Sequence, residues 1–246
     1  MPAAGHDDQV RPFIRRLDEF RKLSDGAVGL IKAAVRERIF KAGAGEDIAC
    51  EGDPCEQVRV FLSGWACRYK VLEDGRRQIV GFVLPGDTCD AYIYLFSRMD
   101  HSIGSLTSVT WCEFDRAGFE QLIAADKTIA EALWCETLVN CAIQREWTLN
   151  AGRRDALERV AHVICELFAR LSLVGLADKN SFAFPVTQVD LADATGLSTV
   201  HVNRTLQELR AAGVITLRER QVIIHDLEAL SRMAMFTPYY LHLERR

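Results

Sequence analysis

The segment 187–210 constrains the fold more than any other part of the chain. Thr187 fits the N-cap of one helix, with Asp190 in the first turn to complement the helix dipole. Gly196 permits a sharp turn, and Ser198 fits the N-cap of a second helix directly after it. This order of cap, turn glycine and cap predicts two helices that cross at a tight turn, a helix-turn-helix.

The second of these helices has one apolar face and one polar end. Val202, Leu206 and Leu209 recur at helical spacing and form the expected buried face. The side chains left near the N-terminal end could enter a major groove. Arg204 suits a bidentate contact to guanine, Asn203 a contact to adenine or a phosphate, and Val200 a contact to a thymine methyl.

Residues 213–224 predict a two-stranded hairpin with basic residues at its tip, a wing able to reach the DNA backbone. A plain helical hairpin with no DNA role is the alternative, but the caps, the turn and the wing all coincide. Thr199 and Thr205 suit phosphate contacts. The expected DNA-contacting residues are Thr187, Ser198, Thr199, Val200, His201, Asn203, Arg204, Thr205, Arg218 and Arg220.

A different pattern precedes this region. Helical spacing of apolar residues covers 10–35, and from about 36 to 114 apolar and polar residues alternate in short runs. Glycines at positions 52, 64, 75 and 86 punctuate these runs at 12, 11 and 11 residues. Regular strand and turn spacing of this kind predicts an antiparallel sandwich or β-roll.

Residues 127–150 predict a long helix that is apolar nearly all round, so it must be covered on more than one side. An a/d-like repeat, broken at Glu146, would pack against a second copy of the chain. A helix buried wholly within one subunit fits the periodicity equally well. The segment 150–154 interrupts the pattern and is the expected hinge. The repeat consists of Ala132, Cys135, Val139, Ala142 and Leu149.

Composition excludes several classes of protein. The net charge of −4 argues against nonspecific coating of nucleic acid, although 151–246 carry 12 Lys/Arg against 11 Asp/Glu. No run of about 18 apolar residues predicts a membrane span. The N-terminus lacks the features of a secretory signal, so we expect a cytoplasmic protein. No nucleophile–base pair or phosphate-binding glycine loop indicates an enzyme.

Eight cysteines are scattered without a C-x-x-C pair, so we expect no metal site and no cofactor. Cysteines in apolar segments usually behave as small hydrophobic residues. Cys50 and Cys55 flank a turn that could hold a reversible thiol switch. The cysteines in apolar segments are Cys112, Cys135, Cys141 and Cys165.

The order of helices, β-roll, long helix and winged helix-turn-helix resembles the Crp/Fnr family of bacterial regulators, most specifically at 187–224 and at the turn 84–87. The resemblance implies an α+β fold: an N-terminal β-roll (a cyclic-nucleotide-binding-like jelly roll), a long dimerisation helix and a C-terminal winged helix-turn-helix. The corresponding domains are 1–126, 127–152 and 153–246. It also implies a homodimer that binds double-stranded DNA, on a near-palindromic site with half-sites about 34 Å apart, and that recruits or blocks RNA polymerase.

Departures from the family pattern carry expectations too. Cyclic-nucleotide-binding members have Gly-Glu-Leu where this chain has Gly86-Asp87-Thr88, and an Arg with small neighbours where only Arg98 is present. A buried phosphate without a guanidinium partner is costly, so we expect no dependence on cyclic AMP. The expected effector pocket is Gly86, Asp87, Thr88, Arg98 and Ser102.

No cysteine precedes Cys50, which argues against the family's iron–sulfur cluster, and a lone His101 is a weak candidate haem ligand. Val200 stands where many members have Glu, so the preferred half-site should differ at that base pair. The residues from Leu227 to Leu241 predict an extension that packs on the wing domain. A sensing module for a ligand or redox signal, whose winged helix contacts protein instead of DNA, remains the alternative.

Overall fold

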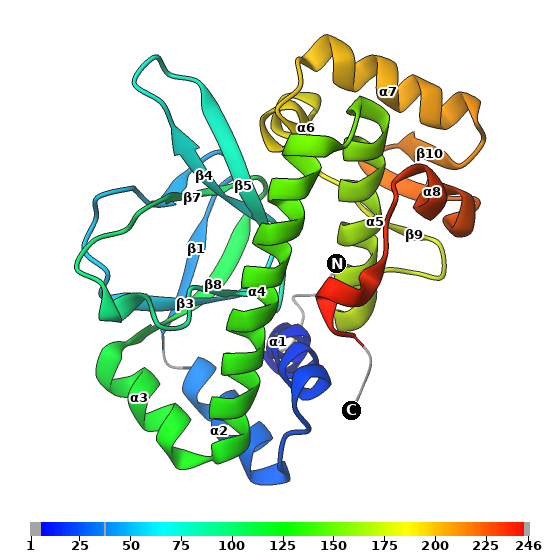
Figure 1. The fold of residues 1–246 in the computed structure, drawn as a ribbon. Helices are drawn as coiled ribbons and strands as arrows, with labels where there is room; N and C mark the ends of the chain where they lie inside the picture. Colours follow the sequence, from blue (N-terminus) through cyan, green and yellow to red (C-terminus); the bar gives the residue numbers. More distant parts are fainter. Residues whose placement is uncertain (1–5, 37, 244–246) are drawn as a thin grey trace. The chain divides into compact units, whose positions relative to one another are not determined.

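The computed structural model describes residues 6–36 and 38–243, and its chain forms two compact units (Figure 1). The first unit contains the chain up to Tyr69 and Phe82–Asn140, and the second contains Lys70–Gly81 and Cys141–His242. This division differs from the expected boundaries at 126 and 152. A hairpin from the strand-rich region and the C-terminal half of the long helix belong to the second unit.

The eight strands β1 to β8 form a β-roll of two four-stranded antiparallel sheets, with orders β1-β8-β3-β6 and β2-β7-β4-β5, and all of it except residues 70–81 belongs to the first unit. Both sheets contribute to one apolar core, in which Val60 of β3 and Ile103 of β7 are almost completely buried. Left-handed glycines make the tight turns, as the glycine spacing predicted. The strands are β1 (Ile39–Ala42), β2 (Asp47–Ala49), β3 (Gln57–Ser63), β4 (Ala66–Val71), β5 (Arg77–Val83), β6 (Thr88–Cys89), β7 (Ser102–Ser105) and β8 (Val109–Asp115).

Helices flank this roll in the first unit. The Ser24 side chain caps α2 by accepting from Ala27 N. Asp115 caps α3 in the same way, by accepting from Gly118 N. The helices are α1 (His6–Phe20), α2 (Asp25–Val35), η1 (Ile93–Leu95) and α3 (Arg116–Ala125).

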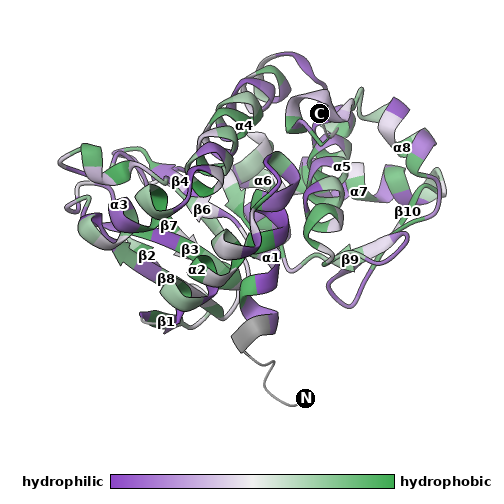
Figure 2. Cartoon of the chain, turned by 90° about the horizontal axis from the view of Figure 1, so that it is seen from below, coloured by the Kyte–Doolittle hydropathy of each residue, from purple (hydrophilic) through white to green (hydrophobic). Residues whose placement is uncertain are grey.

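The long helix α4 spans Lys127–Arg153, and Figure 2 shows hydrophobic residues recurring along it. The segment 150–153 stays helical, so the break falls at Arg154 and Asp155, slightly later than predicted. Asp155 and Glu158 form a capping box that starts the next helix. The second unit then continues with α5 (Ala156–Val174), β9 (Ser181–Ala183), α6 (Gln188–Thr195), α7 (Thr199–Ala211), β10 (Ile215–Arg218), β11 (Gln221–Ile224), α8 (Leu227–Met233) and η2 (Pro238–Leu241).

Candidate DNA interface and effector turn

Helices α6 and α7 form the predicted helix-turn-helix. Thr187 Oγ1 accepts from Asp190 N at 3.1 Å, and Asp190 Oδ2 accepts from Thr187 N at 3.1 Å, which completes a capping box. Gly196 takes the left-handed conformation with φ 67°. Ser198 Oγ accepts from His201 N at 3.3 Å and starts α7. The caps and the turn glycine therefore act as the sequence predicted.

Burial divides α7 into an inner face and an outer face. Val202, Leu206 and Leu209 are at most 2% exposed, as predicted. Thr205 is also only 2% exposed, so its hydroxyl cannot reach a phosphate, and this prediction is wrong. The residue lies one helical turn from Val202 on the buried face. The exposed residues of the N-terminal half are Thr199, Val200, His201, Asn203 and Arg204.

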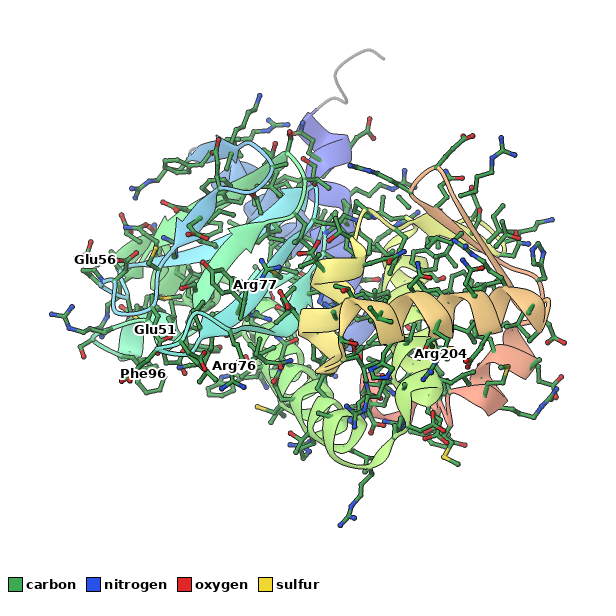
Figure 3. The ribbon with its side chains drawn as sticks, turned by 90° about the horizontal axis from the view of Figure 1, so that it is seen from above. Glu51, Glu56, Arg76, Arg77, Phe96 and Arg204 are labelled. Carbon is green, nitrogen blue, oxygen red and sulfur yellow. The ribbon has the colours of Figure 1, made fainter. Side chains whose placement is uncertain are left out.

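The exposed end of α7 carries groups suited to base edges. Val200 is 75% exposed, and the Arg204 side chain is 67% exposed with Nε 3.6 Å from Glu208 Oε1 (Figure 3). Asn203 Nδ2 donates to Gln188 Oε1 at 3.2 Å. Sequence reasoning missed Gln188, whose position as the first residue of α6, beside the N-cap, was the available signal. The Arg204 side chain pairs with the exposed Glu208, so it can extend toward a guanine.

The wing forms next to α7 as predicted. Strands β10 and β11 pair with Arg218 opposite Gln221, and the two tip residues Glu219 and Arg220 take positive φ. The Arg218 side chain is 79% exposed and contacts Glu219 at 3.1 Å. Arg210 of α7 donates to Leu217 O at 3.2 Å and braces the wing. Two exposed arginines thus lie at the tip, where backbone contacts are expected.

The turn Gly86-Asp87-Thr88 is buried and already paired within the chain. Asp87 Oδ1 lies 3.0 Å from Arg16 Nη1, and Arg16 Nε lies 2.9 Å from Glu136 Oε1 of α4. Thr88 N donates to Glu136 Oε1 at 3.0 Å. All three charged side chains are at most 5% exposed. Burial raises the pKa of Glu136, and Arg16 offsets part of this rise.

A second group of charges adjoins the same turn, in which the side chains of Arg68 and His101 are 13% and 10% exposed and that of Asp90 is 35% exposed. Arg68 Nη2 donates to Thr88 O at 3.2 Å, and Arg68 Nε lies 3.4 Å from Asp90 Oδ2. Burial disfavours the Asp90 carboxylate, but Arg68 and the hydrogen bond from His101 outweigh it and lower its pKa to about 2. His101 Nε2 lies 3.1 Å from Asp90 Oδ2; burial lowers the pKa of His101, but the hydrogen bond to Asp90 and its charge outweigh this and raise the pKa. Arg16, Arg68 and Glu136 were missed by sequence reasoning, because each comes from a segment distant in the sequence.

The other expected pocket residues lie elsewhere. Arg98 donates to Gly52 O at 2.7 Å, in the loop that contains Cys50 and Cys55. Ser102 Oγ accepts from Glu51 N at 2.9 Å and supports the same loop. The residues of the expected pocket therefore lie in two places. Gly86, Asp87 and Thr88 form a turn with buried partners, and Arg98 and Ser102 hydrogen-bond to the loop 50–55.

The cysteines are all free thiols. Cys112 and Cys165 are buried as predicted, whereas Cys141 is exposed on α4. Burial and neighbouring carboxylates raise the pKa of both Cys50 and Cys55. A raised pKa lowers the thiolate fraction at neutral pH and slows thiol oxidation.

The C-terminal extension packs on α5, as predicted. Tyr240 donates from its hydroxyl to Glu166 Oε2 at 2.9 Å, and its ring stacks on His162. Arg154 donates to the carbonyls of Ala234 and Met235, both at 3.2 Å. The extension thereby ties the start of α5 into the second unit.

Comparison with known proteins places both units in one family. A model of the cyclic nucleotide-binding domain matches 39–126, and a model of the Crp-like helix-turn-helix domain matches 158–233. The transcriptional activator protein FnrL of Cereibacter sphaeroides is 31% identical over 193 residues, 76% of each chain. The nitrogen fixation regulation protein FixK of Bradyrhizobium diazoefficiens is 33% identical over 192 residues, 78% of this chain and 79% of that protein.

A solved structure agrees. That of FixK2 from Bradyrhizobium japonicum has a TM-score of 0.72 and 28% identity, and the match covers 81% of this chain and 98% of that one. Among the described residues, no helix has both the length and the apolar character that a membrane span requires. With the β-roll, the long helix, the winged helix-turn-helix and these relatives together, the chain belongs to the Crp/Fnr family and is a DNA-binding transcription regulator.

Proposed function

We propose that the protein acts in the cytoplasm as a homodimer on a near-palindromic promoter site, without cyclic AMP, a resident cofactor or enzymatic activity, and with RNA polymerase as its partner. The observation that carries the proposal is the exposed N-terminal half of α7, with Val200, Asn203 and Arg204 available to base edges. The relatives support the promoter context, because they are named as a transcriptional activator and as a nitrogen fixation regulator.

An exposed stripe on α4 supports the homodimer. Trp134 and Leu138 are 54% and 63% exposed, and Cys141 follows three residues later. Steps of four and three residues are those of a coiled-coil seam. The stripe differs from most of the repeat expected from the sequence: Ala132, Val139 and Ala142 are at most 5% exposed and pack within the chain, whereas Leu149 is 46% exposed. Leu95 and Phe96 of the β-roll, 64% and 70% exposed, add apolar surface in the same unit.

Sedimentation equilibrium tests the dimer. Leu138→Glu places a charge in the seam and should give a monomer at concentrations where the wild type is a dimer. Leu176→Glu is the matched control, because Leu176 is an exposed leucine outside α4. A dimeric Leu138→Glu protein, or a monomeric wild type, would contradict the proposal.

The charges at the effector turn support independence from cyclic AMP. Asp87, Asp90 and Glu136 already pair with Arg16, Arg68 and His101, so a phosphate buried at this turn would have to displace a carboxylate to gain a cationic partner. The residues present therefore do not fit a cyclic nucleotide. Calorimetric titration with cyclic AMP should show no binding, and saturable binding that raises DNA affinity would refute this part.

Selection from a pool of random duplexes tests the DNA site. An enriched palindrome is expected, and Arg204→Ala should lose about 1–3 kcal/mol of binding and relax one base position. Arg232→Ala is the matched control, since its side chain is 64% exposed and also pairs with a glutamate one turn away. Absence of any enriched sequence would favour the alternative of a protein-binding winged helix. Transcription with purified RNA polymerase on a template carrying the selected site then tests the partner.

A further inference from the structure

The β4–β5 hairpin, residues 70–81 of the second unit, contacts helix α6 through one arginine. Arg77 Nε donates to Asp193 Oδ2 at 2.7 Å, and its Nη2 donates to Asp190 Oδ1 at 2.6 Å. Figure 3 shows Arg77 on its strand beside α6. The Arg77 side chain is 31% exposed and the two carboxyl groups are 12% and 24% exposed. These pairs are therefore partly shielded from water. Charge-assisted hydrogen bonds are stronger there than in full contact with solvent.

A second contact joins the same hairpin to helix α4. Gln144 of α4 donates from Nε2 to Val80 O at 2.9 Å, three residues along β5 from Arg77. The hairpin is thus held by α4 at one point and holds α6 at another. Such a bridge restrains the position of α6 within the second unit.

The position of the two aspartates gives this bridge a consequence for DNA. Asp190 belongs to the capping box of α6, and Asp193 lies on the next turn of the same helix. The first helix of a helix-turn-helix crosses the DNA backbone, and its N-terminal end favours an approaching phosphate. Without a cation beside them, these two carboxylates would repel that phosphate.

We propose that Arg77 is a positioning residue for DNA binding: it holds α6 on the hairpin and neutralises Asp190 and Asp193 where the phosphate backbone approaches. The inference rests on DNA binding through α6 and α7 as proposed above. Arg77 acts through the two aspartates and makes no phosphate contact of its own.

The test uses full-length protein and a duplex that the wild type selects from a random pool. Arg77→Ala should weaken binding about tenfold, the scale of one lost charge-assisted contact. Arg76→Ala removes the same charge one residue earlier, where the side chain is 76% exposed and pairs with Asp74, and should stay within about twofold. Equal losses in both variants, or no loss in Arg77→Ala, would overturn the inference.

A charge swap separates positioning from other roles. Arg77→Asp combined with Asp193→Arg should recover most of the affinity that Arg77→Asp loses, with thermal unfolding recorded for each protein. No recovery in a swapped protein that melts like the wild type overturns the inference alone. A wild type that enriches no duplex overturns the proposed DNA site as well.

Discussion

His162 of α5 should make the stability of the second unit depend on pH. The side chain is 1% exposed, with Nε2 3.4 Å from Glu146 Oε1 of α4 and 3.5 Å from the Tyr240 hydroxyl. Burial, followed by the positive charge of Arg154, lowers the pKa of His162 from 6.5 to about 3. The folded chain therefore keeps a neutral imidazole at pH values where the unfolded chain binds a proton.

The direction and size of this pH dependence follow from the difference in proton binding between the folded and unfolded chains. Between pH 6.5 and 3 the unfolded chain binds more protons, so the free energy of unfolding falls as the pH falls. Each pH unit in this window corresponds to about 1.4 kcal/mol. Between about pH 7.5 and pH 5 the contribution of His162 is therefore about 2 kcal/mol.

Urea unfolding at these two pH values, at one protein concentration, measures the effect. The variant His162→Gln cannot titrate, so its stability should fall by about 2 kcal/mol less than that of the wild type over this interval. His225→Gln serves as the control, because His225 is exposed and bonded to Thr216. The reasoning is refuted if the wild type and His162→Gln lose the same stability between the two pH values.

Three further variants test the first unit and the wing. Glu136→Ala leaves Arg16 with one buried partner fewer and should cost about 3–5 kcal/mol in urea unfolding, with a much smaller loss when Arg16→Met is added. Gly86→Ala places a Cβ at φ 95° and 2.8 Å from the backbone of Pro12, so thermal unfolding should show a loss of about 1–3 kcal/mol or more. Arg218→Ala should weaken binding to all duplexes alike and reduce the salt slope by about one, measured by fluorescence anisotropy.

Local signals account for what the sequence predicted well. The caps at Thr187 and Ser198 and the turn at Gly196 each depend on a few neighbouring residues, so their pattern is visible in the sequence. The wing at 213–224 could be predicted because two short apolar strands flank a polar, basic tip. Strand and turn spacing predicted a sandwich or a β-roll, and the family resemblance then favoured the β-roll.

The contacts that could not be predicted join residues far apart in the chain. Arg16 meets Glu136 across 120 positions, and Arg77 meets Asp193 across 116. Nothing in the local pattern of either arginine indicates its partner. The predicted phosphate contact of Thr205 was wrong for a related reason. A threonine next to Arg204 suits the buried face of the helix as well as it suits a contact with DNA.

The buried pair of Arg16 and Glu136 also explains which face of α4 stays exposed. Glu136 is two residues from both Trp134 and Leu138, and with 3.6 residues per turn it points away from them. A buried carboxylate that accepts from Arg16 and from the amide of Thr88 permits one rotation of the helix, because any other rotation would leave a charge unpaired. Apolar periodicity alone could not choose among the faces of α4, since apolar residues occur nearly all round it. The ion pair selects the face, and the seam proposed for the homodimer is the stripe that this choice leaves in solvent.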